Sequence, residues 1–239
     1  LTAWFRERGL ERQVWFHVSD EPTLDNLAAY QRASAALRPL LDGFRTFDAL
    51  SDFAFYQRGL VEIPVAATDH IEPFIEHRVP GLWAYYCCVQ KTEVANRFFA
   101  QPSARNRILG VQLYLYRIAG FLHWGFNFYN SAHSRERINP YAVTDSGHAF
   151  PSGDPFVVYP GEDLQPLESL RLRVLHQGLQ DMRALQLLES LTDRATVEGL
   201  IERELGMRIT FKRYPHQAGP LLRLREAVNR RIEALLAPM

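Results

Sequence analysis

Cysteine, net charge and long apolar runs are all scarce in this sequence. Only two cysteines occur among the 239 residues, Cys87 and Cys88, and one adjacent pair excludes both a disulfide framework and a zinc ribbon. Lys plus Arg and Asp plus Glu each number 27, so the charge indicates neither a nucleic acid nor an anionic membrane surface as partner. No apolar stretch approaches the roughly 20 residues of a membrane span. These absences predict a globular protein and leave neutral polar ligands open, sugars among them.

Several motifs that hold cofactors, metals or nucleophiles are also missing. The chain contains no GxGxxG, P-loop, GxSxG or HExxH pattern. Among the eight histidines, His70 and His77 lie on one short segment and are too far apart for a convincing zinc site. The sequence therefore predicts neither a metal nor a cofactor.

Short apolar runs rich in β-forming residues alternate with longer amphipathic stretches, which is typical of βα units. None of these runs alternates cleanly between polar and apolar residues, so we expect each to be buried on both faces, as strands of a parallel sheet are. The predicted strands are Gln13–Ser19, Arg45–Leu50, Ile63–Thr68, Gly81–Cys88 and Phe121–Tyr129.

Apolar residues at helical spacing predict the helices. A segment of about 35 residues rich in Pro, Gly, Ser and His, Asn130–Pro166, follows the fifth strand, and a loop of that length is usually functional or disordered. The predicted helices are Leu24–Leu41, Phe53–Gly59, Glu72–Val79, Ala104–Ile118, Leu167–Leu191, Val197–Leu205 and Leu221–Leu236.

The order of elements favours an α/β fold of the (β/α)8 TIM-barrel type over a doubly wound dinucleotide fold. About five βα units with right-handed crossovers make the C-terminal portion of such a barrel, and a dinucleotide fold would show GxGxxG after its first strand. We expect residues 1–192 to form this portion and residues 193–239 to be a C-terminal helical extension packed on it. Because the chain begins at Leu1 with half a helix, we expect the missing N-terminal half of the barrel upstream, or a partner chain in its place.

Two adjacent carboxylates, Asp20 and Glu21, close the first predicted strand and precede Pro22. Neighbouring side chains of a strand point to opposite faces, so both carboxylates can reach one ligand only if the strand ends at about Asp20. We expect Pro22 to hold Glu21 extended at the start of a loop. Barrel active sites lie at this C-terminal rim.

A second interpretation of the pair is structural. Acidic residues are stabilised near helix N-termini, and Asp20, Glu21 and Asp25 precede or begin the next predicted helix, with Pro22 at a first-turn position. The spacing alone does not decide between a reaction centre and the acidic start of a helix.

Five stretches carry a family resemblance that spans about Val14 to Glu189. In chain order they are VWFHVSDEP, GLWAYYCC, ILGVQLYLYRIAGFLHWGFNFY, PSGDPFVVYPG and ESLRLRVLHQGLQDMRALQLLE. Together they resemble the catalytic domain of glycoside hydrolase family 123 and its related uncharacterised bacterial barrel family. The most specific parts are the strand ending in Asp-Glu-Pro and the strand with Trp124 and Asn127.

The resemblance implies a glycoside hydrolase that acts on a terminal N-acetylhexosamine, with N-acetylgalactosamine the first candidate. Family 123 resembles the family 20 hexosaminidases, in which the acetamido oxygen of the sugar attacks its own anomeric carbon with overall retention. By position, Glu21 would be the general acid and base, and Asp20 would orient the acetamido group. A carbohydrate is then the partner, without nucleic acid, membrane or cofactor; a bacterial source is implied and the compartment stays open.

Other residues near predicted strand ends are candidates for substrate binding. Aromatic side chains can form the wall on which a sugar ring packs, and an amide can bond a hydroxyl, although a place in the barrel core is an equal alternative for the aromatic residues. Of the neighbours Tyr85 and Tyr86, one should face the barrel interior and the other the helices. The candidates are Trp124, Asn127, Tyr129, Tyr86, Asp69, His70 and Tyr159.

Two other functions compete with this hypothesis. One is a carbohydrate-binding or scaffolding barrel that keeps the Asp-Glu pair without turnover. The other is a glycosidase of another sugar class, in which Asp20 meets no acetamido group.

Overall fold

A computed structural model describes residues 1–163 and 165–237, and the chain divides into two compact units. Each unit is built from two separate stretches of sequence, because the chain leaves the first unit and later returns to it. The units are Leu1–Tyr85 with Ile118–Leu122, and Tyr86–Arg117 with His123–Met239.

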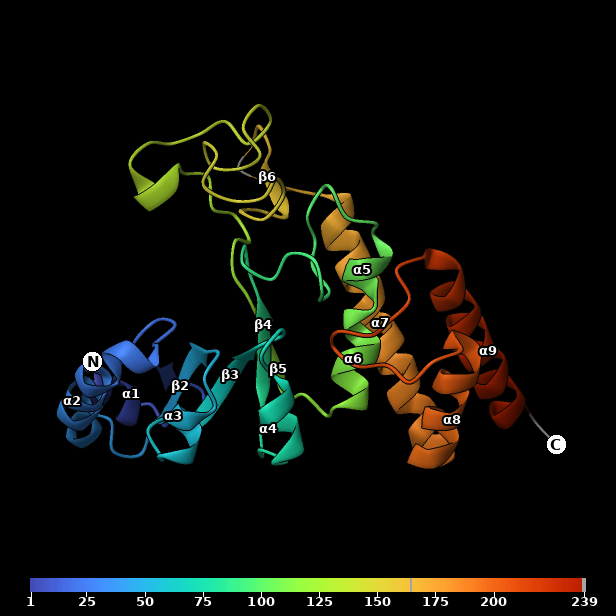
Figure 1. Cartoon of the computed structure of the whole chain (residues 1–239), viewed down its shortest axis with the longest axis horizontal. Coiled ribbons are helices and arrows are strands. Elements are labelled where there is room, and N and C mark those ends of the chain that lie inside the picture. Colours follow the sequence, from blue (N-terminus) through green and yellow to red (C-terminus); the bar gives the residue numbers. More distant parts are fainter. Residues whose placement is uncertain (164, 238–239) are drawn as a thin grey trace. The chain divides into compact units, whose positions relative to one another are not determined.

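A five-stranded sheet follows the order of the sequence, β1-β2-β3-β4-β5. The pairs β1–β2, β2–β3 and β3–β4 are parallel, and Figure 1 shows β2 and β3 side by side. Sequential order is the order of barrel strands, whereas a doubly wound sheet reverses direction at its middle. The strands are β1 Trp15–Phe16, β2 Arg45–Leu50, β3 Ile63–Ala67, β4 Trp83–Tyr86 and β5 Gly120–His123.

Short helices connect the strands of the first unit. The connection from β1 to β2 begins with a capping box, in which Thr23 and Asn26 bond each other's backbone N–H groups. Pro73 lies in the first turn of the helix that connects β3 to β4. The N–H groups of a first turn have no partner within the helix, so the lack of an N–H in proline costs nothing there. The helices are α1 Thr2–Arg6, η1 Leu24–Asn26, α2 Leu27–Leu37, η2 Arg38–Leu40, α3 Ala54–Gln57 and α4 Glu72–Glu76.

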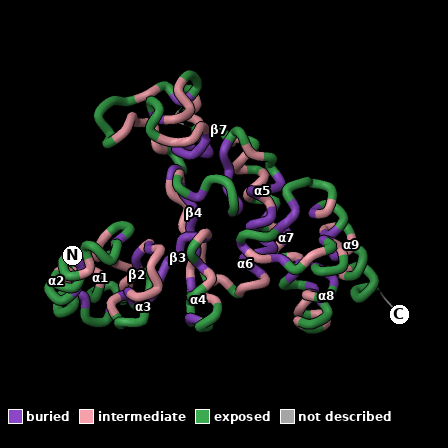
Figure 2. The backbone as a smooth tube through the Cα atoms, viewed as in Figure 1, coloured by how far each residue is buried: buried purple, intermediate pink, exposed green. Residues whose placement is uncertain are grey.

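Burial differs sharply among the five strands. Every residue of β3 is buried, and Figure 2 shows it in purple, as expected for a strand covered on both faces. By contrast, β1 and β5 are only half-buried throughout, and β2 begins with exposed Arg45. The expectation of burial on both faces is therefore wrong for β1, for β5 and for the start of β2.

The five predicted strands all exist, and the mixed α/β class with a parallel sheet followed by helices is confirmed. Five strands do not close a barrel, so an eight-stranded barrel stays a prediction. The first strand is shorter than predicted because the chain leaves the sheet after Phe16.

Long helices dominate the second unit. Ser169 caps α7 by accepting the N–H of Leu172, and Asp193 caps α8 by accepting the N–H of Thr196. Gly206, with φ of 69°, ends α8 in the left-handed conformation that glycine adopts without strain. The helices are α5 Ala104–Arg107, α6 Leu109–Leu115, α7 Leu170–Leu191, α8 Arg194–Leu205 and α9 Ala218–Leu236.

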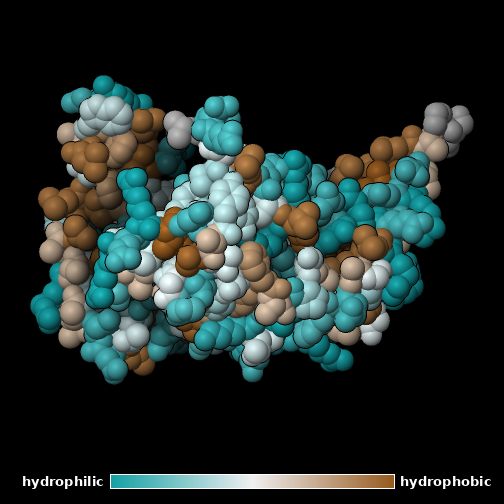
Figure 3. Space-filling view, turned by 90° about the horizontal axis from the view of Figure 1, so that it is seen from above, coloured by the Kyte–Doolittle hydropathy of each residue, from teal (hydrophilic) through white to brown (hydrophobic). Residues whose placement is uncertain are grey.

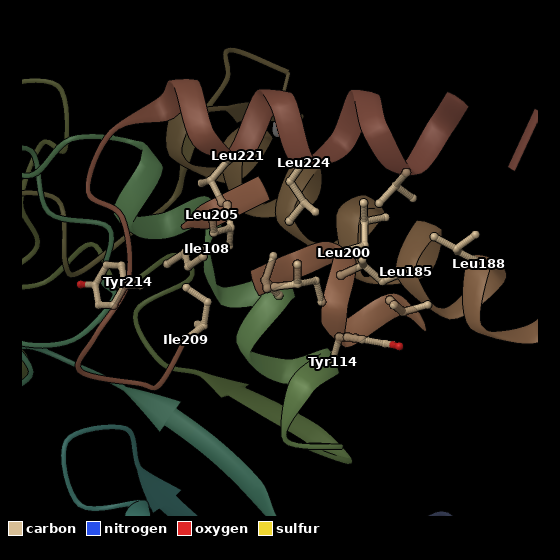
Figure 4. Packing of buried hydrophobic residues seen from close by; sticks show 14 of the residues in the cluster. Ile108, Tyr114, Leu185, Leu188, Leu200, Leu205, Ile209, Tyr214, Leu221 and Leu224 are labelled. Atoms are coloured by element: carbon tan, nitrogen blue, oxygen red, sulfur yellow. The ribbon is translucent and has the colours of Figure 1, made fainter. Parts of the chain in front are cut away.

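The apolar faces of these helices meet in one core. Leu185 and Leu188 from α7, Leu200 from α8 and Leu221 from α9 are all buried there, and Figure 4 shows them converging. The helices α8 and α9 share this core with α6 and α7, and the predicted division after residue 192 stays a prediction. The last two residues of the predicted extension, 238 and 239, lie outside the described residues.

Two glycines allow α7 to touch α5 and α6 backbone to backbone. A Cβ on Gly110 would lie 1.7 Å from the carbonyl oxygen of Gly178, and a Cβ on Gly178 would lie 2.6 Å from the carbonyl oxygen of Arg107. Any side chain at either position would therefore force the helices apart.

The long segment after β5 contains more structure than predicted. A two-stranded antiparallel sheet pairs β6, Val158–Pro160, with β7, Pro166–Glu168, and isolated bridges join Asn127 to Phe156 and Asn130 to Arg137. The prediction of one structureless loop over Asn130–Pro166 is wrong, since short strands rich in proline give no alternating pattern.

Exposed large apolar residues occur both on helices and in the segments between them. Figure 3 shows brown surface toward the C-terminal end of α9, where Leu235 and Leu236 are exposed. Within the described part of the chain, no helix is long and apolar enough to cross a membrane.

Candidate active site

The adjacent carboxylates lie in the loop that follows β1. Asp20 and Glu21 are both exposed, whereas the next residue, Pro22, is buried. The loop thus presents two acidic groups at the carboxyl end of a sheet strand and is fixed by an apolar residue directly behind them. This is the end of the strand at which barrel enzymes place their catalytic groups.

Thr23 and Asn26 form the cap of the following helix. Thr23 is the N-cap residue of η1, and the backbone N–H of Thr23 donates to Asn26 Oδ1 at 3.0 Å. The acidic residue of that first turn is Asp25. Asp25 is thus the acidic residue within the helix, and Asp20 and Glu21 lie before its N-cap residue.

Glu21 has an uncommon backbone conformation. Its φ is 40°, in the left-handed region, so the expectation that Pro22 holds Glu21 extended is wrong. A non-glycine residue with such a φ costs about 1–3 kcal/mol and persists only where its surroundings enforce it. Such residues concentrate at active sites. The backbone conformation of Glu21 therefore adds to the sequence evidence that it is a catalytic residue.

A buried tyrosine orients the Glu21 side chain. The hydroxyl of Tyr85, which is 4% exposed on β4, donates to Glu21 Oε1 at 2.5 Å. One carboxylate oxygen is therefore held by the protein, and the direction of the other follows from it. An exposed carboxyl group with a fixed direction is suited to general acid and base chemistry.

Tyr86, the predicted sugar-binding residue of this strand, faces the other way. It is fully buried, and its hydroxyl donates to Asn106 Oδ1 at 3.1 Å. Burial raises the pKa of Tyr86 to about 12. Its position argues against contact with a substrate. The alternation of strand side chains did not decide which of the two tyrosines faces the site, and in the structure Tyr85 contacts Glu21.

A third residue of the site, Asp48 on β2, was not singled out from the sequence. Its side chain accepts the backbone N–H groups of Val18 at 2.8 Å and Ser19 at 3.1 Å, directly before Asp20. It also accepts the hydroxyl of Tyr30 at 2.5 Å. The only hint in the sequence is one carboxylate in the middle of the otherwise apolar strand end FDAL.

Asp69 and His70 follow β3 as predicted. Asp69 Oδ1 lies 2.9 Å from His70 Nδ1, and His70 is exposed. Because β1 and β3 are parallel strands of one sheet, their carboxyl ends lie at the same edge. The pair keeps the position required of a substrate contact, and that role stays a prediction.

The predicted binding residues that follow β5 belong to the second unit. Trp124 is half-buried, and its indole Nε1 donates to Asp154 Oδ2 at 3.0 Å. Arg97 Nη2 lies 3.1 Å from Asp154 Oδ1 and donates to the carbonyl oxygens of Trp124 and Asp154. Burial raises the pKa of Asp154 to about 6, although the Arg97 charge opposes this. A buried ion pair thus holds the backbone at Trp124.

The other three candidates of this unit lie along the same segment. Asn127 is exposed and bridges to Phe156. The hydroxyl of Tyr129 donates to the carbonyl oxygen of Val158 at 2.8 Å, so this group is engaged with the protein. Tyr159 is half-buried, with its ring 5.2 Å from that of Phe156. Their contact with a substrate stays a prediction.

The first unit also contains a cavity of about 420 Å³ away from the carboxylates. Its lining includes Val18, Arg38, Phe44 and Glu62 but neither Asp20 nor Glu21. Most of this lining precedes β2 and β3, at the ends of the strands opposite the candidate site. Among the described residues, no group of three or more His, Cys, Asp or Glu side chains could hold a metal ion.

Comparisons with known proteins identify a family and a similar fold. The family model described as "Glycoside hydrolase 123, catalytic domain" matches residues 1–188. A solved structure of a family 123 glycoside hydrolase from Clostridium perfringens, described in terms of glycolipid glycan hydrolysis, is similar with a TM-score of 0.62 at 18% identity. That similarity covers 98% of this chain and 42% of the other, so this chain spans less than half its length. No curated protein matches the chain.

Proposed function

Because the chain belongs to glycoside hydrolase family 123, we propose that it hydrolyses the glycosidic bond of a terminal N-acetylhexosamine, with N-acetylgalactosamine the first candidate. The reaction is retaining and uses the acetamido group of the substrate as nucleophile. Glu21 is the general acid and base, and Asp20 binds the acetamido group.

In the first step, the acetamido oxygen forms a bond to the anomeric carbon while the bond from that carbon to the leaving oxygen breaks. Glu21 donates its proton to the leaving oxygen. The product is an oxazolinium ring with positive charge shared between nitrogen and carbon, and the carboxylate of Asp20 accepts the N–H and stabilises this charge.

In the second step, water attacks the anomeric carbon from the face that the leaving group vacated. Glu21, now ionised, takes a proton from this water, and the bond from the acetamido oxygen to the anomeric carbon breaks. The anomeric configuration is retained because two inversions follow each other. No carboxylate forms a bond to carbon, so two adjacent residues suffice, without a second carboxylate about 5 Å away across the sugar.

One observation carries this proposal: Glu21 is exposed, has a strained backbone and receives a hydrogen bond from the buried hydroxyl of Tyr85. An acid that must protonate one particular oxygen needs a fixed direction. The exposed Asp20 beside it has the charge that a developing oxazolinium ion requires.

The test compares p-nitrophenyl N-acetylgalactosaminide, N-acetylglucosaminide and plain galactoside as substrates. We expect hydrolysis of an acetamido sugar and none of the galactoside, which lacks the internal nucleophile. Glu21→Gln should lower kcat/KM by about 10²–10⁴-fold, and by more with a phenyl than with a p-nitrophenyl leaving group, because the poorer leaving group depends more on the acid. Asp20→Asn should lower kcat by about 10²-fold or more.

Matched controls are Glu7→Gln and Asp25→Asn, which replace exposed carboxylates outside the proposed site and should leave activity unchanged. Cleavage of the galactoside as fast as of the acetamido sugars would exclude the substrate-assisted mechanism. Sugar binding without any hydrolysis would support the non-catalytic barrel instead.

A further inference from the structure

Asp48 is a buried carboxylate surrounded by donors from two other segments. It is 1% exposed, and its two oxygens divide their contacts. Oδ1 accepts the N–H groups of Val18 and Ser19 and lies 3.4 Å from His17 Nδ1, while Oδ2 accepts the hydroxyl of Tyr30 from α2. Burial raises the pKa of Asp48 above its ordinary value, and its hydrogen bonds act in the opposite direction.

The sheet register places Asp48 beside the residues that follow β1. Phe16 of β1 pairs with Thr46 of β2, so two residues further along, Val18 lies level with Asp48. In a continuing parallel strand, N–H groups of consecutive residues point to opposite edges, so only one of the Val18 and Ser19 N–H groups would donate to a carbonyl oxygen of β2. Here the Asp48 side chain accepts both N–H groups, and β1 ends at Phe16.

The contacts of Asp48 determine where Asp20 and Glu21 lie. Released from the sheet after Phe16 but held at Val18 and Ser19, the chain turns so that Asp20 and Glu21 are exposed while Pro22 is buried. Asp48 therefore fixes the backbone before the pair, and Tyr85 fixes the Glu21 side chain after the turn. The positive φ of Glu21 lies between these two attachments.

We infer that Asp48 is a positioning residue of the candidate active site: its carboxylate anchors residues 18 and 19 and thereby sets the placement of Asp20 and Glu21. This inference rests on the proposed function for its catalytic consequence. It adds a residue that touches neither the substrate nor the reacting atoms and acts through the loop backbone.

Three variants separate anchoring from general stability. Asp48→Ala removes every contact; Asp48→Asn keeps Oδ1 as acceptor for both N–H groups; Tyr30→Phe removes only the contact to Oδ2. We expect Asp48→Ala to lower kcat by about 10²-fold with KM changed by less than about threefold, since a displacement of about 1 Å can cost that much. Asp48→Asn and Tyr30→Phe should retain kcat within about tenfold.

Hydrogen exchange of the Val18 and Ser19 amides supplies a readout that does not depend on activity. Both amides should exchange much faster in Asp48→Ala than in the wild type, Asp48→Asn or Tyr30→Phe. If no sugar is hydrolysed by the wild type but this pattern is found, the proposed function fails while the anchor remains.

Two results would overturn the inference. One is a loss of kcat in Tyr30→Phe or Asp48→Asn as large as in Asp48→Ala, because stability rather than the two N–H contacts would then matter. The other is unchanged exchange of both amides in Asp48→Ala. If Asp48→Ala does not fold, full protection of both amides and a kcat within about tenfold of the wild type in Asp48→Asn support the anchor, and loss of the protection or a larger loss of kcat contradicts it.

Discussion

Two buried aspartates hold the chain at the ends of two different strands, and they do so with different chemistry. Asp48 in the first unit accepts two backbone N–H groups and one tyrosine hydroxyl, next to a histidine that is largely exposed. Asp154 in the second unit faces a fully buried guanidinium, that of Arg97, together with the Trp124 indole. One carboxylate is satisfied by neutral dipoles, and the other by a full charge.

The two sets of partners determine how many segments of the chain each aspartate holds in place. The backbone donors of Asp48 come from one short stretch, so Asp48 fixes the backbone only of the residues directly before Asp20. Arg97 adds bonds to two carbonyl oxygens, at Trp124 and at Asp154 itself, and therefore ties three distant stretches of sequence together. Removing one partner of a buried ion pair leaves an uncompensated charge, whereas removing one of several neutral donors leaves the carboxylate partly satisfied.

The largest effect is therefore expected for Arg97→Met. This variant removes the counter-charge of Asp154 and a donor to the carbonyl oxygens of Trp124 and Asp154, so the free energy of unfolding should fall by about 3–5 kcal/mol. Urea denaturation measures it. Arg203→Met, which removes an exposed arginine paired with Glu204, is the matched control and should change stability by less than about 0.5 kcal/mol. Equal losses in both variants would contradict the comparison.

A smaller effect concerns pH and Asp154. Its folded pKa of about 6 lies above the unfolded value of about 3.9, so the folded state binds the proton more tightly. The wild type should therefore lose stability relative to Asp154→Asn as pH rises from about 4 to 7, by about 1.5–3 kcal/mol, and the difference should stay constant above that range.

Denaturation curves of the wild type and Asp154→Asn at several pH values measure this difference. In the Arg97→Met background the decline should extend to higher pH, because the counter-charge that favours ionisation of Asp154 is gone. A difference between wild type and Asp154→Asn that does not change between pH 4 and 7 would show that burial does not dominate at Asp154.

The smallest effect is expected for Tyr30→Phe. Loss of one hydroxyl from Asp48, which keeps both backbone donors, should lower the free energy of unfolding by about 1.5 kcal/mol. Tyr141→Phe is the control, since its hydroxyl donates to Pro160 from an exposed side chain. A loss in Tyr30→Phe as large as that of Arg97→Met would mean that neutral donors and a counter-charge are equivalent here.

Sequence patterns located the carboxylate pair but not the groups that hold it. The loop with Asp20 and Glu21 follows from the end of an apolar run and from Pro22. The choice between Tyr85 and Tyr86 could not be made, because alternation along a strand gives two faces without saying which one meets the loop. Asp48 was missed because a single carboxylate in a short strand has no partner within reach in the sequence; its donors lie about 18 to 30 residues away.

The conformation of Glu21 is a second instance. Local sterics at a residue before proline favour extended backbone, and tertiary contacts on both sides of Glu21 overrode this preference. The strained residue lies at the candidate site, where local rules and the final structure are expected to disagree.

The sequence by itself determined the order of strands and helices, the mixed α/β class and the place of two acidic residues after the first strand, because these depend on periodicity and on neighbours along the chain. Only the tertiary structure decided where β1 ends, which tyrosine faces Glu21 and which carboxylate anchors the loop. Each of these depends on hydrogen bonds from the loop after β1 to β2 or β4, which are far from it in sequence, and a buried polar group finds such a partner only when the sheet has brought these segments together.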